Sequence, residues 1–183
     1  MTLNVLANID VENLTLATKF YCSALGLTVG RRFGEFAVEL LGGSCAIYLL
    51  QKAPGTLAAP SSSQQRNYSR HWTPVHLDFV VPQIERAVAR AETAGARLEG
   101  EVHTHVWGRI AVLADPFGHG FCLIEFRGRG YDEIATSLAL PSFGRRRIAI
   151  SESDEIDALS CSMLRRFQHV DQVPKATVSG QTV

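Results

Sequence analysis

The chain has 183 residues, enough for one ordinary hydrophobic core. Its 18 basic and 18 acidic residues balance, so the charge favours neither a nucleic-acid groove nor an anionic membrane surface. No run approaches the roughly 20 apolar residues that cross a bilayer, and the first residues lack the pattern of a signal peptide. Four cysteines without a Cys-x-x-Cys motif are typical of buried thiols in a reducing compartment, so we expect a cytoplasmic protein.

The first half of the chain combines short β-prone runs with one segment of helical apolar spacing. The expected elements are a strand at residues 3–9, a helix over 11–21, and strands at 36–41 and 45–50. Asn13 is suited to cap the start of the helix, and Gly26 lies near its expected end. Gly42 and Gly43 join the last two strands like a hairpin.

The second half repeats this order after residues 53–70, which are rich in Pro, Ser, Ala and Gln and indicate a linker or mobile loop. The expected elements are a strand at 75–80, a helix from 81 onward with Pro82 in its opening turn, a strand near 97–102, and strands at 110–113 and 121–126. A shift of 70 positions places Leu6 on His76 and Leu14 on Ile84. Such internal duplication indicates two similar modules.

The turn before the last strand is Asp115-Pro116-Phe117-Gly118. Pro fixes one corner, Asp can bond to its own backbone, and Gly takes the position that needs a positive φ. We expect His119, which follows, to cap this turn. The turn then delivers the apolar strand at 121–126 into the interior.

Several short motifs occur in one order along the chain. They are Val11-x-Asn13-Leu14 leading to Phe20-Tyr21 and Leu25-Gly26-Leu27, then His76-Leu77-Asp78-Phe79, Trp107-Gly108-Arg109 and Asp115-Pro116-Phe117-Gly118-His119. Over residues 3–133 the chain resembles the vicinal oxygen chelate superfamily of glyoxalases, bleomycin-resistance proteins and extradiol dioxygenases. The resemblance implies an α+β fold of two βαβββ modules whose curved mixed sheets enclose a cavity. It divides a domain at 1–133 into module one (1–52), the linker (53–70) and module two (71–133).

The resemblance also implies where a divalent metal would bind. Metal-using members place a His or similar residue on the first strand of each module and a Glu or similar residue on the last. Carried over, the second-module His is His76 and its first-module counterpart is Leu6, while the Glu positions fall at Cys122 and near Ile47. One ligand of four is present, so we expect the usual metal site to be missing and predict no cofactor. Glu125 does not replace the missing ligands, because strand alternation points it away from the cavity.

Strand alternation identifies polar residues of the cavity face. It sends Asn8 in the first module and His76 and Asp78 in the second to the concave side. Polar groups on the inner face of an apolar strand indicate a ligand cavity, although neighbouring backbone can satisfy them instead. His76 beside Asp78 could act as a general base or donate a hydrogen bond to a ligand, or be held locally without a catalytic task. The sequence assigns no catalytic residue.

The remaining predicted ligand contacts are Tyr48, Trp107, Arg109 and Cys122. An aromatic face and a guanidinium recognise planar or anionic small molecules, with ordinary core packing as the alternative for Trp107. A Cys122 thiolate with His76 could hold a soft cation, but two ligands seldom make a tight site.

His103 and His105 offer another arrangement, since alternation puts them on one face of a strand or loop. They could join His76 in a three-histidine metal site, although the resemblance gives this arrangement no support.

Residues 134–183 lie outside the resemblance and form a C-terminal extension. Apolar residues at helical spacing predict an amphipathic helix over 151–167, and the polar stretch 170–183 is expected to fray. A scaffold that docks a partner through this helix is one alternative function.

The sequence therefore predicts a protein that binds a small organic molecule in an apolar cavity with polar points near Asn8, His76 and Asp78. The antibiotic-sequestering members of the superfamily work in this way. The alternative is a metal-dependent lyase, isomerase or dioxygenase with an altered ligand set that includes His76. The resemblance also implies a homodimer. The sequence leaves open which molecule is bound and whether the chain is an enzyme.

Overall fold

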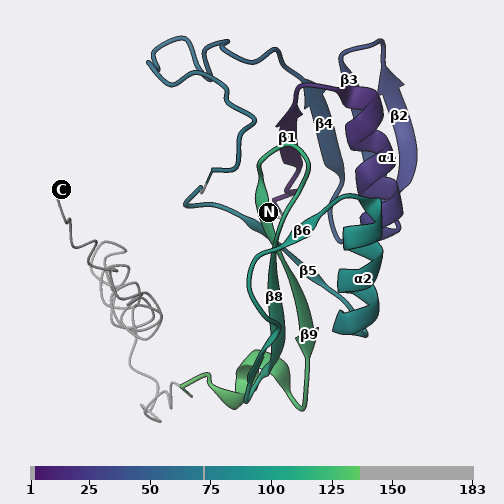
Figure 1. Ribbon diagram of the computed structural model, residues 1–183, viewed down its shortest axis with the longest axis vertical. Helices are drawn as coiled ribbons and strands as arrows, with labels where there is room; N and C mark the ends of the chain where they lie inside the picture. Colours follow the sequence, from purple (N-terminus) through teal and green to yellow (C-terminus); the bar gives the residue numbers. More distant parts are fainter. Residues whose placement is uncertain (1–2, 72, 137–183) are drawn as a thin grey trace, which may run out of the picture. The chain divides into compact units, whose positions relative to one another are not determined.

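The computed structural model describes residues 3–71 and 73–136 (Figure 1). The expected helix at 151–167 and the stretch 170–183 lie outside these residues. The described chain contains two mixed sheets and few helices, which confirms the predicted α+β class. Within these residues, no helix has the length and apolar character needed to span a membrane.

The first module is built in the order β, α, β, β, β. Its elements are β1 (Ala7–Val11), α1 (Leu14–Leu25), β2 (Thr28–Phe33), β3 (Ala37–Leu41) and β4 (Ile47–Gln51). The sheet order is β1-β4-β3-β2, with β1 parallel to β4 and the other pairs antiparallel. The sequence did not predict β2. All six residues of β2 are exposed, so this strand carries no alternation of apolar and polar residues.

The second module repeats this plan with one additional short strand. Its elements are β5 (Leu77–Val80), α2 (Ile84–Ala94), β6 (Arg97–Leu98), β7 (His103–His105), β8 (Gly108–Ala114), β9 (Gly120–Phe126) and the 3₁₀ helix η1 (Gly130–Glu133). The sheet order is β5-β9-β8-β6, and β7 pairs with β8. As in the first module, the strand before the helix is parallel to its neighbour, here β9.

Local chemistry fixes the ends of both helices. Asn13 caps α1, since its Oδ1 accepts a hydrogen bond from the Leu16 amide at 3.0 Å. Gly26 and Gly95 end α1 and α2 in the left-handed conformation, with φ of 71° and 113°. These three predictions are confirmed. Pro82 lies outside the opening turn of α2, because Gln83 is the N-cap residue and the helix begins at Ile84.

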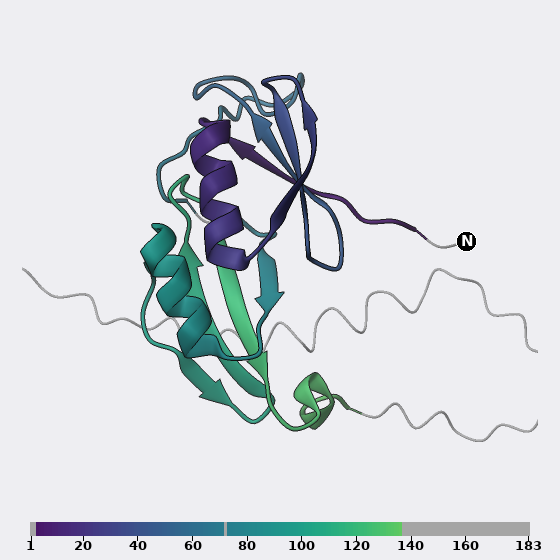
Figure 2. The same ribbon diagram turned by 90° about the vertical axis from the view of Figure 1, so that its right-hand side faces the viewer.

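Each helix covers one face of its own sheet, as Figure 2 shows. The side chains between helix and sheet form the core, and those without solvent exposure include Val38, Leu40 and Leu49 in the first module and Leu113 and Leu123 in the second. Burial of one such side chain contributes roughly 1.5–3 kcal/mol. Within the described part of the chain, the opposite face of each sheet has no helix against it, and this face carries the candidate site.

The two modules meet through the turn that follows β8. Asp115 Oδ1 accepts hydrogen bonds from the amides of Phe117 and His119, both at 2.8 Å, which confirms the predicted turn. Asp115 Oδ2 accepts a hydrogen bond of 2.6 Å from the Tyr21 hydroxyl of α1. His119 does not cap the turn with its side chain. Its Nε2 lies 2.8 Å from the Asp10 carbonyl oxygen and joins the turn to β1.

Candidate functional site

Strand register sets the polar residues on the open face of the second sheet. In β5, Phe79 packs against the core, whereas Asp78 is exposed on the other face, as strand alternation predicted. Asp78 lies opposite Cys122 of β9, and Cys122 in turn lies opposite Val112 of β8. Asp78, Cys122 and Val112 therefore form one row across the sheet, on the side away from α2.

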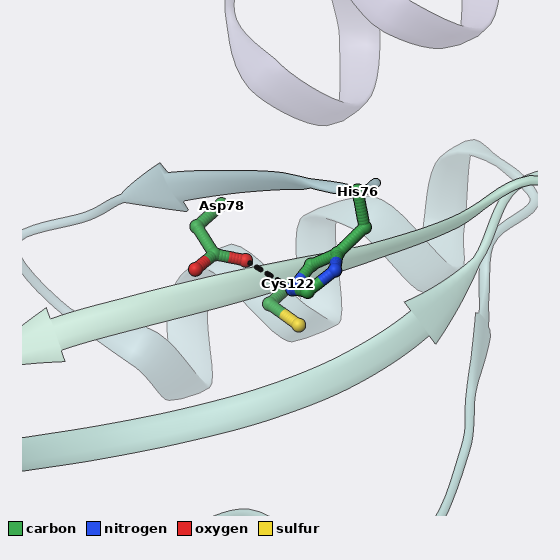
Figure 3. Close-up of side chains that lie close together, drawn as sticks. All are labelled: His76, Asp78 and Cys122. Atoms are coloured by element: carbon green, nitrogen blue, oxygen red, sulfur yellow. Dashed lines mark ion pairs between the residues drawn. The ribbon is translucent and has the colours of Figure 1, made fainter. Parts of the chain in front are cut away.

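His76 completes a compact polar group with two members of this row. Its Nε2 lies 3.2 Å from Asp78 Oδ1. The nearest potential ligand atoms of His76, Asp78 and Cys122 all lie within 4.8 Å of one another (Figure 3). The side chains of His76 and Asp78 are 47% and 38% exposed, whereas Cys122 is 7% exposed. Two accessible polar groups thus stand over a buried thiol.

The thiol of Cys122 has low intrinsic reactivity in this environment. Burial, the charge of Asp78 and a hydrogen bond to Asp78 together raise the pKa of Cys122 to about 12. The thiol is therefore protonated at neutral pH and is not an activated nucleophile.

An aromatic cluster adjoins the polar group. The ring of Tyr131 lies 5.0 Å from that of Trp107 and 4.8 Å from that of Phe126, and His105 stacks on Trp107 at 5.1 Å. Burial raises the pKa of Tyr131, and the charges of Asp78 and Cys122 raise it further. Trp107 is buried, so the aromatic surface that a ligand can reach consists mainly of Tyr131 and Phe126, which the sequence did not single out.

The open face of the first sheet carries a different polar network. Asn8 of β1 lies opposite Tyr48 of β4, and Tyr48 lies opposite Glu39 of β3. The Arg31 guanidinium donates to both Glu39 oxygens, at 2.9 and 2.6 Å, and the Tyr48 hydroxyl donates to Glu39 at 2.8 Å. Hydrogen bonds from Arg31 and Tyr48 hold the pKa of Glu39 at about 2, so this carboxylate is charged and internally paired.

Ile47 does not face the open side of the first sheet, so the prediction that the first-module metal-ligand position falls at this residue is wrong. Ile47 pairs with Ala7, and its side chain is buried in the core beneath α1. Tyr48 faces the open side and lies opposite Asn8. In the second module, Cys122 has the same position opposite Asp78. Tyr48 therefore occupies the first-module position that corresponds to Cys122.

Arg109, a predicted ligand contact, lies apart from the other predicted contacts of the second module. In β8 it shares its face with Ala111, which belongs to the core on the helix side. Its guanidinium forms an ion pair with Glu85 in the first turn of α2. Arg109 thus lies on the opposite face of the sheet from the polar group.

The predicted orientation of Glu125 is confirmed. Its Oε2 accepts a hydrogen bond of 2.7 Å from the amide of Ile84, the first residue of α2. This carboxylate serves the N-terminus of the helix, where unpaired amides and the helix dipole favour a negative charge.

The three-histidine arrangement is not formed. One row across the second sheet contains His103 of β7 at one side and Val80 of β5 at the other. Ile110 of β8 and Ile124 of β9 lie between them in this row. His76 precedes Val80 by four residues, so the register separates the histidines along and across the sheet. Within residues 3–71 and 73–136, the group that includes His76 contains neither His103 nor His105.

The metal-ligand set that the resemblance implies does not fit these residues. The corresponding positions are Leu6 and Tyr48 in the first module and His76 and Cys122 in the second. Leu6 offers no donor atom, and Cys122 places a thiol where a carboxylate oxygen is expected. An octahedral site for a hard cation requires mainly oxygen ligands, which this set does not supply. A different group, His76 with Asp78 and Cys122, has the donor atoms and spacing to hold a metal ion.

Two βαβββ modules, the second with a polar group on the open face of its sheet, are the fold that the resemblance to the vicinal oxygen chelate superfamily implies. Residues 7–124 match the model of the glyoxalase-like domain, which covers more than half of the chain. The chain therefore belongs to the glyoxalase-like domain family. No curated protein matches it.

Several solved structures share the fold of this chain. The hypothetical protein SA1046 from S. aureus is 22% identical, with a TM-score of 0.55 over 68% of this chain and 95% of its own. The fosfomycin resistance protein FosX from Listeria monocytogenes is 16% identical, with a TM-score of 0.53 over 69% and 95%. A glyoxalase/bleomycin resistance protein/dioxygenase family enzyme from Burkholderia phytofirmans is 20% identical, with a TM-score of 0.53 over 67% and 97%. At these identities the similarity shows the fold alone.

Proposed function

We propose that the protein binds a small organic molecule on the open faces of its sheets. The observation that carries this proposal is the second-module face, where Asp78 lies opposite Cys122 and Phe126 lies on the same face of β9 as Cys122, with its ring against that of Tyr131. Binding sites for small molecules combine apolar and aromatic surface with a few polar groups that fix orientation. Asn8 and Tyr48 supply further polar contacts on the first-module face.

The chemistry of the second-module face favours a ligand with a flat ring and a cationic or hydrogen-bond-donating group. Aromatic faces attract cations through the ring quadrupole, and a carboxylate accepts charge-assisted hydrogen bonds. Tyr131 and Phe126 are 47% and 39% exposed, so both rings are accessible to a ligand. Because Arg109 lies on the other face, the guanidinium that the sequence suggested for an anionic ligand is not in this site.

We further propose that binding of this kind sequesters the ligand without converting it. FosX, a fosfomycin resistance protein, shares this fold, so protection against a small molecule is one use to which the fold is put. Sequestration requires shape, stacking and a few polar contacts, which this face offers, and does not require the hard-metal site that Leu6 and Tyr48 fail to provide. The cysteine pattern is typical of proteins in a reducing compartment, which favours the cytoplasm as the place where the ligand is bound.

A homodimer belongs to the same proposal. Apolar side chains on or beside the open faces are exposed in the single chain, among them Leu6 at 57% and Val80 at 62%. A second copy that covers these side chains would shield the ligand from water.

The second candidate function is a metal-dependent lyase, isomerase or dioxygenase with an altered ligand set. The observation that favours it is the convergence of His76, Asp78 and Cys122. Such an enzyme would need its cation for ligand binding or turnover, whereas a sequestering protein would not.

A dye titration with and without chelator separates these functions. The probes are the aromatic cation acridine orange and the aromatic anion 8-anilinonaphthalene-1-sulfonate, added to the full chain. We expect the cation to bind in EDTA, and Asp78→Asn to weaken it roughly fivefold, equivalent to about 1 kcal/mol, without weakening the anion. Asp132→Asn on η1 is the matched control and should leave both affinities unchanged.

Two outcomes would overturn the proposal. One is the absence of saturable binding of either dye. The other is binding that EDTA abolishes and Mn²⁺ restores, which would favour the metal-dependent enzyme.

A further inference from the structure

We propose that His76, Asp78 and Cys122 form a site for a soft divalent cation, with Zn²⁺ as the reference ion. The site lies within one module and needs no residue from the first sheet. It differs in composition from the family's metal set, because Asp78 has no part in that set and Cys122 replaces a carboxylate. The inference does not depend on the small-molecule ligand proposed above.

The spacing of the three side chains suits a tetrahedral ion. Zinc binds nitrogen and oxygen at about 2.0 Å and sulfur at about 2.3 Å, so tetrahedral ligand atoms lie about 3.3–3.8 Å apart. His76 Nε2 and Asp78 Oδ1 are 3.2 Å apart, and all three donor atoms lie within 4.8 Å of one another. Rotamer adjustments of the exposed His76 and Asp78 side chains can bring both of their donor atoms within this range of the Cys122 sulfur.

The sheet holds two of the three residues in place before any ion binds. Asp78 and Cys122 are directly opposite each other on parallel strands, and His76 immediately precedes β5, with its Nε2 3.2 Å from Asp78 Oδ1. Cys122 is buried and its neighbour across β8 is the apolar Val112, so the thiol is confined near the donor atoms of His76 and Asp78. A sheet provides a rigid frame for ligands, which favours affinity because little ordering remains to be done on binding.

The donor set selects the type of metal. The Cys122 thiol releases its proton to solvent when the metal–sulfur bond forms. The resulting thiolate is a soft ligand, and together with an imidazole it favours zinc-like ions over Mg²⁺ or Mn²⁺, which prefer oxygen. A thiol and one histidine alone seldom make a tight metal site, and Asp78 supplies a third ligand. Three protein ligands leave one tetrahedral position open, the arrangement found where zinc also binds water or a substrate.

Zinc titration of the reduced, metal-stripped full chain tests the site directly. Equilibrium dialysis followed by elemental analysis should give one Zn²⁺ per chain, and Mg²⁺ at the same concentration should not compete. Co²⁺ substituted for Zn²⁺ should give a thiolate-to-cobalt charge-transfer absorption, which reports the sulfur ligand without reference to any activity.

Single substitutions then assign the ligands. Cys122→Ser should abolish the charge-transfer absorption, and His76→Ala and Asp78→Asn should each weaken zinc binding at least about tenfold. His76 and Asp78 are exposed, so these two variants should keep the melting temperature of the metal-free chain even if Cys122→Ser does not fold. Cys22→Ser and Cys45→Ser are matched controls that remove a thiol outside this group and should bind zinc like the original chain.

The proposal is overturned if the chain takes up no stoichiometric zinc, if Cys122→Ser keeps the charge-transfer absorption, or if a control cysteine variant loses it. The dye titration has independent outcomes: acridine orange binding in EDTA with no zinc uptake would support the proposed function alone. Zinc uptake without dye binding would support the metal site alone.

Discussion

At the scale of single residues, Glu39 gives the first module a pH-sensitive contribution to stability. Hydrogen bonds from Arg31 and Tyr48 lower its folded pKa from an ordinary value of 4.5 to about 2. A carboxyl group with a depressed folded pKa stabilises the protein above its unfolded pKa, and this contribution is lost as the pH falls through the folded pKa. We therefore expect the free energy of unfolding to fall between pH 4.5 and pH 2 in part because of Glu39.

Denaturant unfolding of the chain and of Glu39→Gln over this pH range checks the expectation. The variant should be less stable at pH 7, and the difference between the two proteins should shrink as the pH falls to 2. Asp132→Asn, on the exposed 3₁₀ helix, should show no such convergence. A stability difference that stays constant from pH 7 to pH 2 would contradict the assignment.

The sequence predicted some site residues and missed others for a clear reason. Alternation along β5 was enough to place Asp78 on the open face, and the duplication was enough to align Leu6 with His76. The sequence did not predict Glu39 as a residue of the open face, because the apolar Val38 and Leu40 on either side of it are typical of a buried strand. Alternation could have found it, since a charged residue between two core residues must face the other side of the sheet.

At the scale of elements, Glu125 stabilises the start of α2. Gln83, the N-cap residue, makes no side-chain capping hydrogen bond, and Glu125 from β9 accepts the Ile84 amide in its place. Loss of an N-terminal cap costs about 1 kcal/mol, and loss of a charge at the helix N-terminus costs about 0.5 kcal/mol. We expect Glu125→Ala to be less stable than Glu125→Gln, and both to be less stable than the original chain.

Thermal unfolding followed by circular dichroism measures this order. Glu125→Ala should lower the melting temperature by about 4 °C. Because Glu125 faces α2, neither variant should change zinc uptake or dye binding. A Glu125 variant with normal stability but lost ligand binding would show that this side chain turns to the open face.

Element boundaries and registers set the limit of what the sequence could predict. The caps at Asn13, Gly26 and Gly95 follow from local chemistry, so they were predicted correctly. The register of β4 against β1 depends on the length and path of the preceding hairpin, which no local pattern records. An error of one residue there exchanged Ile47 for Tyr48 and thus a core residue for a surface residue.

At the scale of the whole molecule, the open sheet faces determine how the protein associates. Val80 is 62% exposed and lies in the row next to Asp78 and Cys122. If a second copy covers this face, a charged side chain introduced at position 80 loses its water in the dimer but keeps it in the single chain. The free-energy cost of this desolvation therefore weakens dimerisation. We expect Val80→Asp to raise the dimer dissociation constant at least about tenfold while leaving the fold intact.

Sedimentation velocity over a range of protein concentrations gives the dissociation constant for each variant. Leu16→Asp is the matched control, because Leu16 is 58% exposed on the outer side of α1, in its first turn, where an acidic residue is tolerated. A monomer at all concentrations would refute the dimer, as would a Val80→Asp variant that dimerises like the original chain while Leu16→Asp does not. That second result would move the interface from the sheets to the helices, and the ligand would then bind on a face exposed to water.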